Sequence, residues 1–256
     1  MRRLIIIALA VMAMASCAKK VVPLAAPFDP AGDLKKANEQ LEDNHGDAAR
    51  RLLENIIRLD TTGEYAPLAQ LRVADSYVME ELPDLAEEEY DEFLRTYPRH
   101  KYASYAMYQT GMVYYKLIKG PDRGFGYAMK ALEAFERLNE EYPRNPYRQE
   151  ALLKIEQCRA VMAEHEYMVG QFYYKKDACH GAVGRFELVL RDYPEYSGRA
   201  RMLYQLAVCY EKLGEKEKSA STLDTITSEF PASGYREKAL EEIQEYREET
   251  SPPESR

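Results

Sequence analysis

The sequence predicts an all-α protein in which helical hairpins stack side by side, and three observations support this fold class. A six-position pattern of small, aromatic and apolar residues recurs along the chain. A proline follows an aromatic residue at the end of most copies of that pattern. The composition, with 21 Tyr, no Trp and only 13 Gly among 256 residues, suits packed helices better than a sheet protein rich in turns.

The bulk properties exclude several classes of protein. Hydrophobic residues make up 46% of the chain, which excludes wholesale disorder. A mean hydropathy of −0.55 with 30% charged residues excludes an integral membrane bundle. The formal net charge is −8 and no basic stripe interrupts it, so nucleic acid is not an expected partner.

Residues 1–16 are typical of a bacterial lipoprotein signal peptide. Two arginines precede an apolar run from Leu4 to Met14, and Cys17 follows two small residues. The run is too short to span a bilayer, which needs about 20 residues. We therefore expect cleavage before Cys17 and attachment of acyl chains, palmitate among them, to this residue. Met14 stands where the lipobox prefers Leu, so an ordinary signal peptide cut near Ser16 is the alternative.

Residues 17–31 are expected to form a tether between the membrane and the folded domain. Three prolines and the lack of a helical period indicate a semi-extended chain. At about 3.1 Å per residue, this segment would reach on the order of 40 Å from the membrane. A triacylated cysteine carries enough chains for stable anchoring. Ala18 rather than Asp follows the cysteine, which favours the outer membrane over the inner one.

The repeat frame has six positions, and three copies keep the same intervals between them without a gap. The first position is small, the second aromatic, the third small again, the next two are large and apolar, and the last is proline. The three copies are Ala74, Tyr77, Ala86, Tyr90, Phe93 and Pro98; then Gly170, Tyr173, Ala182, Phe186, Val189 and Pro194; then Ala207, Tyr210, Ser219, Leu223, Ile226 and Pro231.

Each position has a physical role in a hairpin of two helices. The small residues let the helices approach closely, and the aromatic residue fills the space beside the first of them. The fourth position lies one turn after the third on the inner face of the second helix. The proline ends that helix, because it lacks an N–H and clashes with the preceding turn. The series resembles the 34-residue tetratricopeptide motif.

Two further units are degenerate copies of the frame. One spans Gly111 to Pro143 and carries eight extra residues, which we expect to form a longer loop within Lys116 to Lys130. The other lies at the N-terminal end and has Gln40 for the aromatic residue and Thr61 for the proline. Terminal repeats are often atypical. The sequence therefore predicts a superhelix of about five tetratricopeptide hairpins over residues 32–249.

The C-terminal half adds two features to the repeats. Little interrupts a helical period over residues 147–175, so we expect one long helix of about 40 Å there, or two helices with a kink. Residues Tyr235 to Glu248 are expected to form a last helix that caps the end of the core. Residues 250–256 are expected to be a flexible tail.

No group of residues forms a recognisable catalytic or metal site. His165-Glu166 begins like the helix of a zinc protease, but residue 169 is Val instead of the second histidine. Cys179 and His180 are adjacent on one helix and point about 100° apart, so they cannot form a nucleophile–base pair. We therefore expect no enzyme activity, no cofactor and no bound metal.

The cysteines other than Cys17 are three in number. We interpret Cys158, Cys179 and Cys209 as buried core residues, since cysteine behaves as a small hydrophobe. An odd number of thiols in an oxidising compartment leaves at least one of them free.

Two stretches of the sequence carry a likeness to a known family. The first runs from Glu166 to Pro194, contains Arg185 and ends in Leu-Arg-Asp-Tyr-Pro; the second runs from Tyr90 to Tyr108. Together with the signal peptide, the number of repeats and the insertion in the third repeat, they make the chain resemble the BamD/ComL family of outer-membrane assembly lipoproteins. The likeness extends more loosely from about Gly32 to Glu245.

The resemblance implies a scaffold that is anchored in the outer membrane and faces the periplasm. Such a protein binds the periplasmic domains of a barrel-shaped insertase, accompanies other assembly-machinery lipoproteins and helps deliver unfolded outer-membrane β-barrel proteins. By the same analogy, the C-terminal repeats contact the insertase, with Arg185 as a partner-binding residue, and the N-terminal repeats receive substrate segments. The Thr61-Thr62-Gly63 turn departs from the aromatic–proline turn that the family has there.

Other functions remain open at this point. A pilotin-like tetratricopeptide lipoprotein for a pilus or secretin would share the anchor and the repeats, and only the stretches around Arg185 and the co-purifying partners separate the two. A lipoprotein linked to peptidoglycan or division usually adds a coiled coil, and no sustained heptad is visible. An enzyme would need a catalytic group that the sequence does not display.

Overall fold

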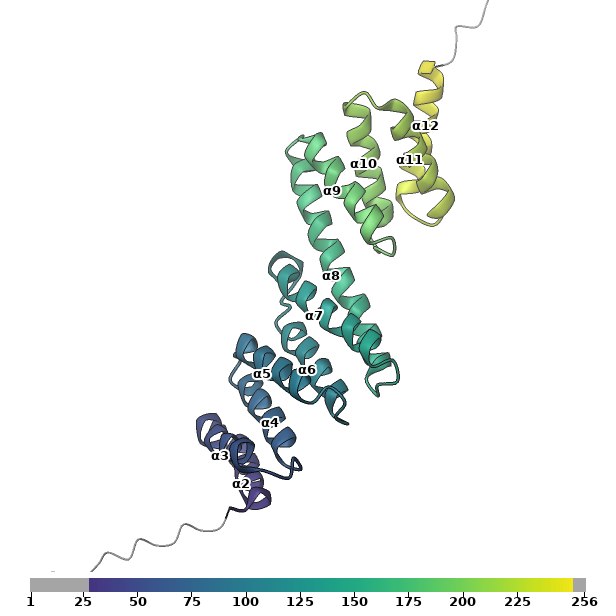
Figure 1. The fold of residues 1–256 in the computed structure, drawn as a ribbon. Coiled ribbons are helices and arrows are strands. Elements are labelled where there is room, and N and C mark those ends of the chain that lie inside the picture. Colours follow the sequence, from purple (N-terminus) through teal and green to yellow (C-terminus); the bar gives the residue numbers. More distant parts are fainter. Residues whose placement is uncertain (1–27, 251–256) are drawn as a thin grey trace, which may run out of the picture.

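The computed structural model describes residues 28–250, with side chains up to residue 244; Cys17 and most of the expected tether lie outside the described residues. The described residues form only helices, in the order shown in Figure 1. These are α2 (Pro30–Glu42), α3 (Gly46–Leu59), α4 (Ala66–Met79), α5 (Pro83–Thr96), α6 (Ala103–Tyr115), α7 (Pro121–Glu141), α8 (Arg148–Lys175), α9 (Cys179–Asp192), α10 (Arg199–Lys212), α11 (Lys216–Glu229) and α12 (Tyr235–Thr250).

The helices pair into five hairpins that follow one another along an elongated molecule. The hairpins are α2–α3, α4–α5, α6–α7, α8–α9 and α10–α11, and α12 packs against α11 and α10 as a cap. Each helix packs against the next one in the chain, and Figure 1 shows α2 and α12 at opposite ends. The expected all-α superhelix of tetratricopeptide hairpins with a C-terminal capping helix is confirmed.

The first helix starts two residues before the expected boundary at residue 32. Asp29 is its N-cap, and its carboxylate accepts a hydrogen bond from the backbone N–H of Gly32 at 3.0 Å. Pro30 occupies the first turn, where the missing N–H carries no penalty. Pro30 and Ala31 therefore belong to α2 rather than to the tether.

The small positions of the repeat frame are buried where two helices cross. Ala182 and Ala207 are 0% and 1% exposed. A Cβ added at Gly170 would lie 2.5 Å from the ring of Phe186, and one at Gly111 would lie 2.5 Å from the ring of Phe135. The two glycines thus make room for a phenylalanine on the second helix of the same hairpin.

The aromatic second position does not keep one role throughout. Tyr114 and Tyr210 are buried as expected, at 1% and 6% exposure. Tyr173 is 37% exposed, so the expectation that it fills the core is wrong. Its ring lies over Gly181, where an added Cβ would be 2.9 Å from the ring. Tyr167, 1% exposed, takes the core position on the same helix.

Four hairpins turn through the same backbone conformation. A residue seven positions after the first small residue has a positive φ in each of them: Asn44, Glu81, Asp177 and Gly214. The next residue donates its N–H to the carbonyl five positions earlier, as His45 does to Gln40 and Ala178 does to Tyr173. This is the Schellman arrangement, which satisfies the last carbonyls of a helix.

The third repeat differs from the sequence-based expectation. Its extra residues are helical and not a loop: α7 begins at Pro121 and is 21 residues long, against 13 or 14 in the other helices of the first three repeats. Gly120, with φ of 140°, precedes it as the N-cap. The added turns pack on α8, where the ring of Phe125 lies 4.7 Å from that of His165. The carbonyl of Pro121 lies 2.7 Å from Nδ1 of the same histidine.

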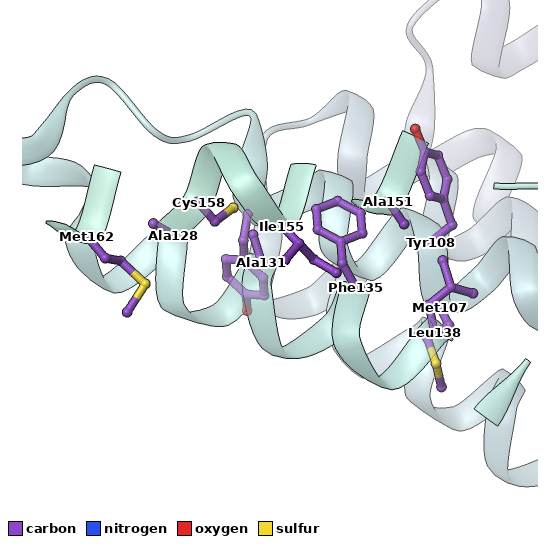
Figure 2. Close-up of a cluster of buried hydrophobic side chains, with 11 residues drawn as sticks. Met107, Tyr108, Ala128, Ala131, Phe135, Leu138, Ala151, Ile155, Cys158 and Met162 are labelled. Atoms are coloured by element: carbon purple, nitrogen blue, oxygen red, sulfur yellow. The ribbon is translucent and has the colours of Figure 1, made fainter. Parts of the chain in front are cut away.

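The long segment before Gly170 is one continuous helix. α8 contains 28 residues and serves two hydrophobic cores in succession. Its first half contributes Ile155 and Cys158 to the core of the third repeat, and its second half contributes Ala163 and Tyr167 to the core of the fourth. Figure 2 shows Phe135 of α7 beside Ala151 and Ile155 of α8 in the first of these cores.

Tyrosines connect neighbouring helices through carboxylates. A buried phenol fills apolar space with its ring and needs a hydrogen-bond partner for its hydroxyl. In the second to fifth hairpins, tyrosine hydroxyls donate to carboxylates on another helix. These contacts give the tyrosines a structural role in a helical protein. The pairs are Tyr90 with Asp75, Tyr114 with Glu87, Tyr196 with Glu164, Tyr204 with Glu242 and Tyr210 with Glu187.

None of the helices in the described part of the chain is both long and apolar enough to span a membrane.

Candidate partner-binding surfaces

A groove formed by the first three repeats and the start of α8 is one candidate binding surface; we call it the N-terminal groove. It has a volume of about 450 Å³ and lies between the first helices of these repeats, α2, α4 and α6. Leucines and tyrosines form most of its wall, with three polar residues among them. The lining residues are Leu34, Asn38, Leu68, Leu71, Arg72, Asp75, Tyr102, Tyr105 and Tyr147.

Asp75 organises the polar part of the N-terminal groove. Its carboxylate accepts hydrogen bonds from Tyr90 Oη at 2.6 Å and Tyr105 Oη at 3.3 Å. Arg72 donates to the other carboxylate oxygen at 2.9 Å. Burial and the nearby Asp75 charge raise the pKa of Tyr105 to about 12, so its hydroxyl stays protonated and remains a donor.

One acceptor in this groove has no donor among the described residues. The side-chain Oδ1 of Asn38 is buried and makes no hydrogen bond there. A buried polar atom without a partner is unfavourable, and a ligand N–H can satisfy it. Apolar and aromatic walls with a few fixed polar groups suit an extended peptide that carries apolar side chains.

The second candidate surface lies where the long helix joins the two halves of the molecule; we call it the bend groove. Its volume is about 810 Å³. The walls are the start of α7, the middle of α8 and the turn between α9 and α10. The lining residues are Pro121, Glu156, Arg159, Ala160, Val161, Ala163, Glu164 and residues 192–197.

The bend groove combines apolar and acidic groups. Tyr196 donates to Glu164 at 2.7 Å, which fixes the turn against α8. Arg159 pairs with Glu136 at 2.6 Å. The sequence did not indicate this surface, because its residues come from three segments with no common motif. The one feature of the sequence that pointed to this region was the expected helix over residues 147–175, which is twice as long as a normal repeat helix.

Arg185, the predicted partner-binding residue, lies on α9 and is not among the lining residues of the bend groove. Its Nη1 donates to Oε2 of Glu166 on α8 at 2.7 Å. The Arg185 side chain is 43% exposed, whereas that of Glu166 is 9% exposed. The Glu166 charge also helps burial to raise the pKa of Tyr193, a lining residue of the bend groove. The arginine is therefore half-exposed, but it is already paired within the chain.

The three cysteines lie in the core as expected, whereas His165-Glu166 is not an exposed pair, because Glu166 is buried. Cys158, Cys179 and Cys209 are buried with free thiols. No cluster of three or more His, Cys, Asp or Glu residues that could hold a metal occurs within residues 28–250. His165 contacts the carbonyl of Pro121 and the ring of Phe125, so it positions the α7 extension.

Two solved structures that are similar to the chain are of tetratricopeptide proteins. One is the complex of the TPR2AB domain of yeast Sti1 with pHSP90, with a TM-score of 0.43 and 16% sequence identity; the match covers 86% of both chains. Another is YrrB, a TPR protein with an unusual peptide-binding site, with a TM-score of 0.36 and 19% identity; the match covers 84% of this chain and 92% of that one.

Sequence relatives carry a functional name. A protein of Neisseria meningitidis named outer membrane protein assembly factor BamD is 25% identical over 210 residues, which cover 78% of this chain and 79% of the relative. A protein of the same name from Rickettsia prowazekii is 26% identical over 183 residues, which cover 72% and 73%. A family model described as YfiO, outer membrane lipoprotein, matches residues 32–223, about three quarters of the sequence. The chain therefore belongs to the YfiO family of outer membrane lipoproteins.

Proposed function

We propose that this protein is a lipid-anchored scaffold of the machinery that assembles β-barrel proteins in the outer membrane. The match of residues 32–223 to an outer membrane lipoprotein family is the observation that carries the proposal. The relatives named assembly factors BamD support the same role. A superhelix of tetratricopeptide hairpins binds other proteins, and the function is that of a scaffold and not of an enzyme.

The anchor in this proposal is Cys17. Acyl chains on the cysteine would hold the protein at the outer membrane, and the segment before α2 would let the superhelix extend into the periplasm. Metabolic labelling with palmitate should mark the protein, and Cys17→Ala should abolish the label. A mature protein that begins at another residue would contradict this part of the proposal.

The N-terminal groove would receive segments of unfolded β-barrel proteins. Such segments are extended and alternate apolar with polar side chains, so their apolar residues can pack on the leucines and tyrosines. The donorless Oδ1 of Asn38 offers an acceptor for a backbone N–H of the segment.

The bend groove and the half-exposed Arg185 would contact the periplasmic domains of the barrel insertase. An aromatic and acidic groove, together with a half-exposed arginine on α9, has the composition of a polar protein interface. Other lipoproteins of the same machinery are expected to assemble around the complex of this scaffold with the insertase. The two surfaces lie in different halves of the superhelix, so one chain can hold a substrate and the insertase together.

Affinity isolation from detergent-solubilised outer membranes tests the proposal as a whole. We expect the wild-type lipoprotein to retain the barrel insertase. Recovery of a pilus secretin without the insertase would favour the pilotin-like alternative and overturn our assignment.

A matched pair of tyrosine variants tests the substrate groove. Tyr102 lines the N-terminal groove and is 38% exposed, whereas Tyr127 is 40% exposed and lies outside it, on α7. Tyr102→Ala should weaken the binding of a synthetic β-strand segment of an outer-membrane protein, and Tyr127→Ala should not. Equal binding by both variants would exclude Tyr102 as a contact.

A further inference from the structure

The structure brings two of the three thiols together at the junction of the fourth and fifth repeats. Cys179 begins α9 and Cys209 lies near the end of α10, about thirty residues later. An ion pair between Asp177, two residues before Cys179, and Lys212, three residues after Cys209, holds the two helix ends together. Both belong to the same hydrophobic cluster, at 6% and 0% exposure. Cys158 lies in a different cluster, that of the third repeat.

We propose that Cys179 and Cys209 form a disulfide that links α9 to α10, and that Cys158 is the thiol left free. The proposal rests on the function proposed above in one respect, because only an oxidising compartment such as the periplasm supplies the oxidant. It identifies which two cysteines pair and which one stays free, which the odd number of thiols in the sequence does not.

The surroundings give the two thiols different roles. Cys179 lines a surface cavity of about 350 Å³ together with His180, Gly181 and Lys212, and it keeps a small exposed surface. Cys209 has no exposed surface, and burial together with the contact to Cys179 raises the pKa of its thiol to about 12. Cys179 is therefore the residue that meets the oxidant, and Cys209 is the residue that resolves the intermediate.

The oxidant is a protein dithiol oxidase in its disulfide form, and the exchange balances. Cys179 loses its thiol proton and attacks one sulfur of the oxidase disulfide, and the other sulfur of the oxidase leaves as a thiolate. Cys209 then loses its proton and attacks Sγ of Cys179, which releases the first oxidase sulfur. Two thiols of this chain are oxidised to one disulfide, the oxidase is reduced to a dithiol, and the two protons go to its sulfurs.

Lys212 and Asp177 frame the entrance to the pair. The Lys212 ammonium lies 2.5 Å from the Asp177 carboxylate and interacts electrostatically with both thiols. Asp177 holds the positive-φ position of the α8–α9 turn, and Lys212 ends α10. This ion pair already connects the start of α9 with the end of α10, which are the two segments that the disulfide would link. The disulfide can therefore form without a rearrangement of the helices.

Peptide mapping tests the pairing directly, because trypsin places the three cysteines in different peptides. Cleavage after Lys and Arg leaves Cys158 in residues 155–159, Cys179 in residues 177–185 and Cys209 in residues 202–212. The full-length protein is equilibrated with a mixture of reduced and oxidised glutathione, denatured, alkylated without reduction and digested. We expect peptides 177–185 and 202–212 to appear as one disulfide-linked species, and Cys158 to be alkylated.

Two further samples separate the pairing from the proposed location. The same mapping on protein isolated from cell envelopes should give the linked species there too. If the link forms with glutathione but is missing from the envelope protein, the compartment is wrong and the proposed disulfide does not exist in the cell. If glutathione produces no link, or links Cys158 instead, the pairing itself is overturned, whatever the compartment.

A stability measurement supplies a readout that does not depend on digestion. Reduction should lower the thermal midpoint of the oxidised wild type by roughly 5 °C. Cys158→Ser should keep this response, whereas Cys179→Ser and Cys209→Ser should lose it. An equal response of all four proteins to the reductant would contradict the proposal.

Discussion

Individual residues replace parts of the repeat frame where the frame fails. Thr61 stands where the other repeats have proline, and the neighbouring Asp60 organises the turn in its place. Its Oδ2 accepts from the backbone N–H groups of Tyr65 at 2.7 Å and Ala66 at 2.8 Å, and its Oδ1 accepts from Thr62. A carboxylate that accepts several N–H bonds can hold a turn that no proline ends. The frame thus located the anomaly, but only the structure identified the residue that compensates for it.

The Asp60 turn predicts an acid-dependent contribution to stability. Hydrogen bonds, that of the Thr62 side chain first, hold the pKa of Asp60 well below its ordinary value of 3.8. The folded state therefore binds this proton less readily than the unfolded state. The ionised carboxylate therefore contributes its full stabilisation at pH values above the ordinary pKa of 3.8, and this contribution is lost as the pH falls below 3.8. As the pH falls from about 5 to about 3, the free energy of unfolding should therefore decrease less for Asp60→Asn than for wild type. Urea unfolding at each pH measures this free energy.

A second carboxylate of the same turn serves as the control for this measurement. Glu64 is exposed, and Glu64→Gln removes one charge without touching the Asp60 contacts. It should keep the wild-type dependence on pH. The same acid slope in wild type and Asp60→Asn would show that the turn does not depend on the ionised carboxylate.

Glu81 adopts a left-handed backbone conformation in which the fifth repeat has glycine. Its φ is 57°, whereas the equivalent position is Asn44 in the first repeat and Gly214 in the fifth. Glycine adopts this conformation without the steric penalty that other residues incur. Glu81→Gly should raise the free energy of unfolding by about 0.5–1 kcal/mol. Gly214→Glu should lower it by a similar amount, and both are measured by chemical denaturation. No gain in Glu81→Gly would show that the strain is absent.

At the level of the elements, the sequence predicted most of the hairpins because their constraints are local. Proline ends a helix wherever it occurs, and small residues at fixed spacing mark helix crossings. The α7 extension was missed for the opposite reason. Gly120, Gly124 and Gly126 favour a loop by propensity, but the contacts of Phe125 and Pro121 with His165 stabilise a helix there. Those contacts join segments about forty residues apart, which a local pattern cannot report.

The fit of Gly170 against Phe186 gives a quantitative test of hairpin packing. An added Cβ would lie 2.5 Å from the Phe186 ring, so Gly170→Ala should destabilise the protein by about 1–3 kcal/mol. Adding Phe186→Leu should recover part of this loss, because the fifth repeat pairs Ala207 with Leu223 at the same two positions. The free energies are measured by urea unfolding.

Gly184 provides the matched control on the other helix of the same hairpin. It lies in the middle of α9, and an added Cβ would meet no atom within 4 Å. Gly184→Ala should therefore stabilise the protein by about 0.5–1 kcal/mol, the helix-propensity difference alone. If the two substitutions changed stability by the same amount, close packing at Gly170 would not explain its glycine.

For the whole molecule, α8 determines where the two candidate surfaces lie. The N-terminal groove uses the repeats before the long helix, and the bend groove uses the helix itself. The sequence predicted which side of α9 is buried, through Ala182, Phe186 and Val189, and Arg185 lies beside that side and is half-exposed. It could not predict the pairing with Glu166, which depends on how α8 packs against α9. The bend groove was unpredictable for the same reason, since its walls meet only after the superhelix has formed.

The contact between Arg185 and Glu166 changes how the partner-binding hypothesis must be tested. Arg185→Glu would place a second carboxylate against one that is nearly buried, and would therefore destabilise the hairpin as well as alter the surface. The double variant Arg185→Gln with Glu166→Gln removes both charges and leaves an uncharged polar amide at each position. It should remain folded, which circular dichroism and the thermal midpoint can establish.

The double variant should bind the periplasmic domains of the insertase more weakly than wild type. A half-exposed charged contact contributes less than a buried one, so we expect a loss of about 1–2 kcal/mol, roughly tenfold in affinity by calorimetry. Arg137→Gln is the matched control, because that arginine is 46% exposed and its partner Glu141 lies on the same helix, α7. The control should bind as tightly as wild type. If the folded double variant does so too, Arg185 serves only to pair with Glu166 and is not a contact for the insertase.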